Sequence, residues 1–296
     1  MVRDTSISSK ILTVVIHATF VLVVAITLLP ILHVFAVSFS SGKAYSGGIG
    51  IVPKDFTLSA YDIIMKAGTV PNALVNSIIY MVSGTALNIA LTSMMAFALS
   101  RKRLAFRTAY TIFVLIPMFF SGGMIPSFIL IKNLGLYNTI GAMILPGAIS
   151  VWNLIIMRTF FLSVPNDLDE SALMDGANNF TIFIRIILPV SSASIATIAL
   201  FYAVGHWNSW FGAMIYLRDM EKYPLQLVLR NIVIQGQMER EFVAARDYAA
   251  AEGMSQVNDE SIKYATLVVS ILPMLFIYPF LQRYFVKGVL IGSLKG

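Results

Sequence analysis

The chain has 296 residues, of which 57% are hydrophobic and only 12% are charged. An ordinary soluble domain is about 45–50% apolar and about 25% charged, so much of this chain is expected to lie in lipid. The absence of cysteine excludes disulfides, thiol nucleophiles and thiolate metal sites. The net charge of +6 comes from basic residues that alternate with long apolar stretches. This pattern indicates membrane orientation rather than nucleic-acid binding.

Six charge-free segments predict an all-α membrane protein with six transmembrane helices. Crossing about 30 Å of hydrocarbon takes about 20 apolar residues in a helix. The first segment lies within the charge-free run from Ile11 to Gly42 and has no small-residue cleavage pattern, so we expect a retained span rather than a signal peptide. The six predicted spans cover residues 12–38, 74–99, 108–131, 138–157, 190–216 and 264–282. Residues 1–11 then form an N-terminus, 12–282 the transmembrane domain and 283–296 a C-terminal tail.

Basic residues between the second and third spans predict the orientation. Lys and Arg gather in cytoplasmic loops of membrane proteins, and this loop holds Arg101, Lys102, Arg103 and Arg107. With both termini on the same side, the cytoplasmic segments carry eleven Lys and Arg against five Asp and Glu. Lipid head-group binding is the alternative explanation for the cluster.

Two long loops fall on the outer side in this orientation. Residues 39–73 contain several glycines before Pro53, which predicts a flexible connection followed by a short surface element. Residues 217–263 are richly charged, and within them the stretch from Glu239 to Glu252 is predicted as a short surface helix. That helix is either a docking surface or part of a solvated loop.

The spans lack the groups that would drive transport or catalysis. None contains Asp, Glu, Lys or Arg, although proton-coupled transporters usually carry ionisable groups inside the membrane. His17 and His33 are sixteen residues apart, and we expect each to bond a neighbouring carbonyl. The phosphate-binding pattern G-x-x-x-x-G-K-[ST] is absent, because Gly42-Lys43 is followed by Ala44. We therefore expect no enzyme and no bound cofactor, with any energy supplied by another chain.

The cytoplasmic loop of residues 158–189 is the most informative segment. Pro165 suits the first turn of a helix, and acidic residues after it suit the positive end of the helix dipole. Gly176 can adopt the left-handed conformation that ends a helix. An apolar stripe follows at helical spacing, made of Phe180, Phe183, Ile184 and Ile187, and Pro189 closes it. Helices that lie on a lipid surface favour basic polar faces, and this loop is acidic. The sequence therefore predicts two short helices, joined at a glycine, that dock on a protein partner.

The spacing of this loop resembles the EAA loop of binding-protein-dependent ABC importer permeases. Ser171 replaces the usual alanine, and the proline often found shortly after Leu-Pro is absent from residues 190–194. The end of the chain resembles the tail of the maltose-type carbohydrate branch, and the whole chain is similar to permeases for complex oligosaccharides, including the alginate importer. The residues that carry the resemblance are Glu170, Ala172, Asp175, Gly176, Ala177, Phe183, Ile186, Leu188 and Pro189, with residues 282–288 and 292–296 in the tail.

This resemblance implies an ABC type I importer permease in the bacterial inner membrane. It implies a second permease subunit, two ATPase subunits that bind ATP and Mg, and an external solute-binding protein as partners. The tail is expected to reach the ATPase interface as well. Carried over by position, the ATPase-coupling residues are Glu170, Ala172, Asp175, Gly176 and Ala177.

Aromatic and amide side chains near the outer end of the fifth span suggest a solute path. His206, Trp207, Asn208 and Trp210 lie close together in the sequence, and flat aromatic faces beside amides suit sugar rings. The alternative is an aromatic belt at the membrane interface. On the second span, Asn76, Tyr80 and Asn88 are expected to form interhelical hydrogen bonds. An importer permease for an oligosaccharide is thus the main hypothesis, and a nucleotide-independent channel or facilitator, or a membrane scaffold, is the alternative.

Overall fold

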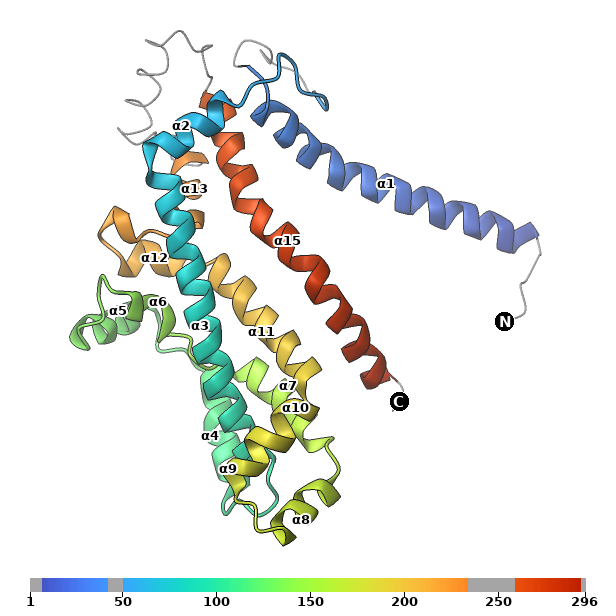
Figure 1. Cartoon of the computed structure of the whole chain (residues 1–296), viewed down its shortest axis with the longest axis vertical. Coiled ribbons are helices and arrows are strands. Elements are labelled where there is room, and N and C mark those ends of the chain that lie inside the picture. Colours follow the sequence, from blue (N-terminus) through green and yellow to red (C-terminus); the bar gives the residue numbers. More distant parts are fainter. Residues whose placement is uncertain (1–6, 42–49, 234–258, 294–296) are drawn as a thin grey trace. The chain divides into compact units, whose positions relative to one another are not determined.

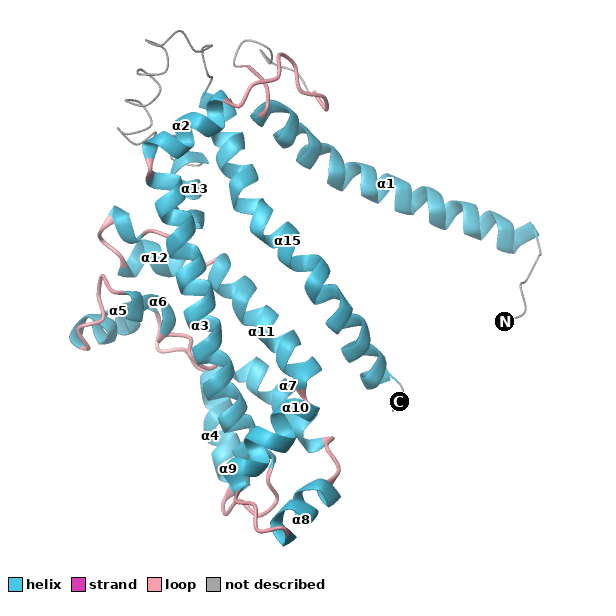
Figure 2. Ribbon diagram, viewed as in Figure 1, coloured by secondary structure: helices cyan, strands magenta, loops and turns pink. Residues whose placement is uncertain are grey.

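The computed structural model describes residues 7–41, 50–233 and 259–293, and all regular elements in this part of the chain are helices (Figures 1 and 2). The predicted surface helix from Glu239 to Glu252 lies outside the described residues. The chain divides into two units: residues 1–70 with 231–271, and residues 71–230 with 272–296.

The first unit contains α1 (Ile7–Ser38), α2 (Ser59–Ala67) and the first part of α15 (Asp259–Ser293). Apolar side chains cover α1 on all sides and are exposed along most of its length, as expected of a helix that faces lipid. Its histidines bond carbonyl groups as predicted, because Nδ1 of His17 lies 2.7 Å from the Thr13 oxygen and Nδ1 of His33 lies 2.9 Å from the Gly50 oxygen.

The second unit begins with α3 (Thr69–Ser100), which is long and apolar enough to cross a membrane without interruption. Shorter helices follow it on the way to the cytoplasmic loop. They are α4 (Arg107–Phe119), α5 (Met124–Asn133), α6 (Ile140–Ile144) and α7 (Val151–Leu162). After the loop come α11 (Ser192–Trp207), α12 (Phe211–Tyr216), a 3₁₀ turn (Met220–Lys222) and α13 (Leu225–Val233).

Three of the six predicted spans are interrupted in the structure. The third is a pair, α4 and α5, bent by 112° where Gly123 takes a φ of +88° that favours glycine. The fourth breaks between α6 and α7 at Pro146 and Gly147, which are poor helix formers. The fifth stops at Trp207, and α11 itself is bent by 83° from the helix before it. The first, second and sixth spans are continuous helices.

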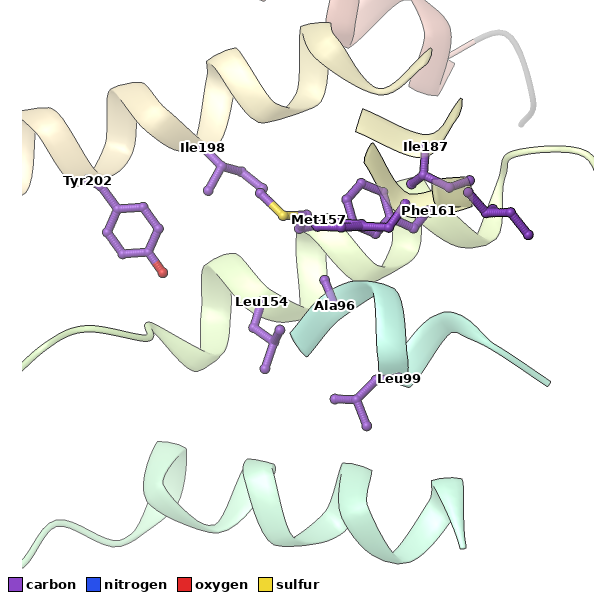
Figure 3. Packing of buried hydrophobic residues seen from close by; sticks show 10 residues of the cluster. Ala96, Leu99, Leu154, Met157, Phe161, Ile187, Ile198 and Tyr202 are labelled. Atoms are coloured by element: carbon purple, nitrogen blue, oxygen red, sulfur yellow. The ribbon is translucent and has the colours of Figure 1, made fainter. Parts of the chain in front are cut away.

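A hydrophobic cluster near the cytoplasmic loop holds the second unit together (Figure 3). The side chains come from α3, α7, the loop and α11, so the cluster links three spans to the loop. Its buried members are Ala96, Leu99, Leu154, Met157, Phe161, Ile182, Phe183, Ile187, Ile198 and Tyr202.

Candidate functional site

The cytoplasmic loop forms two short helices, as the sequence predicts. The first is α8 (Asn166–Met174), and Pro165 stands at its N-cap with a φ of −56°. Asp167 and Asp169 lie in the first turn of α8, where the positive end of the helix dipole stabilises carboxylates. In Figure 1, α8 lies at the same end of this unit as the connection from α3 to α4.

The turn after α8 depends on Gly176, whose φ is +80°. The Gly176 N–H donates to the Leu173 carbonyl at 3.1 Å, and the Ala177 N–H donates to the Ala172 carbonyl at 2.9 Å. These two bonds define a Schellman motif, which ends a helix at a left-handed residue and pairs its last carbonyls. The predicted helix end at Gly176 is confirmed.

The second arm of the loop starts immediately, because the Asn178 side chain accepts a 2.8 Å hydrogen bond from the Thr181 N–H and caps the helix. This arm consists of α9 (Asn179–Ile182), a π-helical turn (Phe183–Ile187) and α10 (Leu188–Val190). Such single π turns are rare and occur often at functional sites.

The predicted apolar stripe on this arm is divided between the core and the surface. Phe183 and Ile187 are buried, but Phe180 is 66% exposed and Ile184 is 44% exposed. The arm is not one regular α-helix, because the Leu188 N–H bonds to the Phe183 carbonyl five residues back in a π turn. The α-helical spacing used for the prediction therefore does not hold beyond Phe183, and Phe180 precedes this turn, in α9. Ile182 takes the buried position instead.

The proposed coupling residues occupy both sides of the Schellman turn. Glu170, Asp175 and Gly176 face solvent, whereas Ala172 and Ala177 pack against the hydrophobic cluster. Exposed apolar side chains surround the acidic groups. They are Leu168, Leu173, Met174 and Phe180, and Met174 is 88% exposed. The outer surface of the loop is therefore both acidic and apolar.

The base of the loop is tied to the end of α3. The Arg158 Nε donates to the Leu99 carbonyl at 3.0 Å, and Arg101 forms an ion pair with Asp169. Burial lowers the pKa of the Arg101 guanidinium, which still remains charged at physiological pH.

The four candidate solute-path residues do not form one accessible surface. His206 bonds Asn88 across the helices at 2.6 Å, and Trp207 is only 1% exposed. The Asn208 amide donates to the Val204 carbonyl of its own helix at 2.9 Å. Trp210 is 37% exposed, and the Arg230 guanidinium lies 4.8 Å from the centre of its ring. Asn208 and Trp210 are therefore the exposed members of the set, while His206 is partly exposed.

A buried polar network joins α3 and α11 to the broken fourth span. Besides the Asn88–His206 pair, the Tyr202 hydroxyl lies 2.8 Å from the Thr92 hydroxyl and accepts from the Ser150 N–H at 2.9 Å. The sequence predicted the interhelical role of Asn88, but it gave no reason to single out Tyr202 or Thr92. Asn76 and Tyr80 instead donate to backbone carbonyls of residues 221–223. In the part of the chain that the structure describes, no group of three His, Cys, Asp or Glu residues could hold a metal ion.

The model of one protein family matches residues 88–291, which include α3 from Asn88 onward, the whole cytoplasmic loop and the last span. The family is described as the binding-protein-dependent transport system inner membrane component. The chain belongs to this family. The resemblance to ABC importer permeases is thereby confirmed, together with the all-α permease fold. As an inner membrane component of such a transport system, the permease acts with a solute-binding protein and other components of the transporter.

Relatives and a solved structure agree with this assignment. The permease is 40% identical to the polygalacturonan/rhamnogalacturonan transport system permease protein YtcP of Bacillus subtilis, over 97% of this chain and 99% of the relative. It is 27% identical to the arabinooligosaccharides transport system permease protein AraQ of Halalkalibacterium halodurans, over 98% and 99% of the two chains. A chain in the crystal structure of a bacterial ABC transporter involved in the import of the acidic polysaccharide alginate matches with a TM-score of 0.90 and 31% identity. That match covers 96% of this permease and 100% of the solved chain.

Proposed function

We propose that this permease is one of two membrane subunits that import an oligosaccharide, and that its cytoplasmic loop couples transport to two separate ATPase subunits. The relatives named for polygalacturonan, arabinooligosaccharides and alginate support a saccharide cargo. An external binding protein delivers the solute. The permease does no chemistry itself, and ATP and Mg are bound by the partner ATPases. Both termini and the loop lie in the cytoplasm, as the basic residues beside α3 indicate.

The observation that carries the coupling role is the exposed tip of the loop at the Schellman turn. Glu170 and Asp175 supply charge there, and the exposed apolar residues around them, above all Met174, supply area for burial in a partner. Exposed apolar groups on a cytoplasmic loop have no lipid to cover them, and contiguous patches of this kind mark protein interfaces. Such a surface is not expected of a channel that works without nucleotide.

The test is Gly176→Ala in the complex reconstituted with its ATPases and binding protein. Nothing lies within 4 Å of a Cβ atom at Gly176, so the substitution acts through the backbone. A left-handed alanine costs roughly 1–2 kcal/mol, which shifts the turn that presents the coupling residues. We expect a loss of ATP hydrolysis stimulated by the binding protein.

Gly68 provides a matched control. It also follows a short surface helix, has a φ of +76° and has open space at its Cβ position. It belongs to the outer segment before α3 rather than to the coupling loop. Gly68→Ala therefore carries the same backbone penalty, and we expect it to keep stimulated hydrolysis. Equal effects of the two variants would refute the coupling role of the Gly176 turn.

The cargo is tested with a panel of neutral and acidic oligosaccharides in the same reconstituted complex. Each sugar is offered with the binding protein, and uptake into vesicles is measured together with ATP hydrolysis. Uptake of an oligosaccharide that depends on ATP supports the importer. Uptake that continues without nucleotide would instead support the channel.

A further inference from the structure

The end of α3 and the start of α8 are joined by one ion pair. The Arg101 Nη1 contacts Oδ2 of Asp169, and both side chains are largely covered, with 22% and 17% exposed. Arg101 directly follows α3, and Asp169 lies in the first turn of α8. The neighbouring carboxylate, Glu170, faces solvent instead. The two adjacent acidic residues of α8 thus differ in exposure, with Asp169 largely covered beside Arg101 and Glu170 open to solvent.

An aromatic ring also contacts Arg101. The guanidinium carbon lies 4.3 Å from the centre of the Phe97 ring, within the range of a cation–π interaction. The Phe97 ring in turn lies 5.1 Å from the ring of Phe183 in the second arm of the loop. The end of α3 therefore contacts both arms of the coupling loop through Phe97 and Arg101.

The ion pair uses only one of the two contacts that its groups can form. The Arg101 Nε and the Asp169 Oδ1 are buried and have no hydrogen-bond partner in the described residues. A guanidinium and a carboxylate can form two parallel bonds, and here one bond is used. Both groups line a cavity of about 610 Å³, which leaves room for their relative position to change. Lys102, Arg103 and Glu170 are the other charged residues around this cavity.

Chain connectivity shows why α3 needs such a link. The second arm of the loop continues directly into α11, so a displacement of the loop reaches that span through the backbone. Helix α3 ends more than fifty residues before the loop and does not continue directly into it. A side-chain contact can carry the displacement to α3, and a buried charged pair resists separation because each partner would be left uncompensated.

We propose that Arg101 and Asp169 are positioning residues for coupling, whose ion pair passes movements of α8 to α3. This inference rests on the proposed function, because it needs an ATPase that moves α8. Removing the ion pair leaves α8 free to dock on the ATPase but weakens its link to α3, so α3 follows the movement less completely. Hydrolysis then continues without a matching amount of transport.

The experiment is a charge swap in the reconstituted transporter. Arg101→Asp, Asp169→Arg and the double variant are compared for co-purification of the ATPase, stimulated ATP hydrolysis and solute taken up per ATP hydrolysed. We expect each single variant to lower the uptake per ATP about tenfold and the double variant to recover most of it, since the two residues are directly coupled. Lys102→Asp is the matched control, because it makes the same charge change beside the same cavity, and it should leave the ratio unchanged.

A cross-link between positions 101 and 169 provides a second test, which is used if the single charge variants do not assemble with the ATPase. The chain has no cysteine, so Arg101→Cys/Asp169→Cys can be joined by a short reversible thiol cross-linker in a transporter whose other chains lack accessible thiols. Uptake per ATP should rise on cross-linking and fall again on reduction. A double swap no better than the worse single variant, or no response to cross-linking, would overturn the proposal. Absence of stimulated hydrolysis in the unaltered complex would instead count against the proposed function.

Discussion

Asn88 of α3 and His206 of α11 share a hydrogen bond of 2.6 Å between the Asn88 Oδ1 and the His206 Nε2. The Asn88 amide nitrogen also donates to the carbonyls of Gly147 at 3.0 Å and Ala148 at 2.8 Å. One side chain thus joins two spans and pairs the non-helical backbone of a third. Irregular backbone is tolerated within a membrane only where its polar groups are paired. Asn88 therefore allows the fourth span to break.

Asn88→Ala should destabilise the permease strongly. It leaves the partly buried Ala148 carbonyl and His206 imidazole and the more exposed Gly147 carbonyl without their partner, and an unpaired group costs about 1–3 kcal/mol where it is buried. We expect a total loss of about 3 kcal/mol or more, measured as a lower thermal midpoint in detergent. Asn72→Ala on the same helix is the control, because its bond to the Glu221 carbonyl is exposed to solvent. Equal losses in the two variants would contradict the role given to Asn88.

Position 84 of α3 has no room for a side chain larger than that of glycine, because the His206 ring lies beside it. A Cβ atom at Gly84 would overlap the ring, and the bond to Asn88 keeps the ring from moving away. Gly84→Ala should therefore cost about 1–3 kcal/mol of stability, the usual cost of overpacking. In the same assay, Gly205→Ala should be neutral or stabilising, because nothing lies near that position on α11.

The pairing of Gly84 with His206 can be checked by a double variant. With His206→Ala in place, Gly84→Ala should cost much less than it does alone, because the overlapping ring is gone. Strict additivity of the two changes would show that Gly84 is small for another reason.

Local signals predicted the two short helices of the cytoplasmic loop and the turn between them well. Pro165, the acidic first turn and Gly176 act through their own backbone or through neighbours within one helical turn, so their effects can be inferred from spacing alone. The π turn at Phe183 could not be inferred, because it depends on which side chains fit the hydrophobic cluster.

The sequence predicts where the spans lie more readily than where they are interrupted. Hydropathy depends on composition, and an apolar segment has the same composition whether it is one helix or two. Pro146 and Gly147 mark a weak point, but the break needs Asn88 and Tyr202 from distant segments to pair the freed backbone. Such partners lie more than fifty residues away, and the sequence does not indicate them. The ion pair of Arg101 with Asp169 was missed for the same reason.

Trp207 and Trp210 should respond differently to substitution. Trp207 is 1% exposed, so Trp207→Ala should cost about 3–5 kcal/mol of stability by leaving a large cavity. Trp210 is partly exposed and stacks with Arg230. We expect Trp210→Ala to fold and to need a higher solute concentration for half-maximal uptake. Trp210→Phe should lie closer to the unaltered permease. A Trp210→Ala variant with normal uptake at every solute concentration would favour the interfacial aromatic belt.

Asp219 predicts how pH affects the connection between Asn138, at the start of the fourth span, and the segment that follows the fifth span. Its Oδ2 accepts hydrogen bonds from the Lys222 Nζ at 2.8 Å and the Asn138 amide at 2.7 Å. Asn138 also accepts from the N–H groups of Arg218 and Asp219. The bonds from Lys222 and then Asn138 lower the pKa of Asp219 below its ordinary value of 3.8. The carboxylate thus stabilises this connection while it is ionised.

The sign of the pH effect follows from that direction. Because the pKa of Asp219 is lower in the folded chain than in the unfolded chain, its contribution is complete above about pH 4 and disappears as the pH falls through the folded value. The thermal midpoints of the unaltered permease and Asp219→Asn should therefore differ by a constant amount from pH 7 to 5 and converge in stronger acid. Lys222→Met, which removes the main cause of the shift, should reduce this convergence. A difference of the same size at pH 3 and pH 7 would show that the charge of Asp219 does not stabilise the connection.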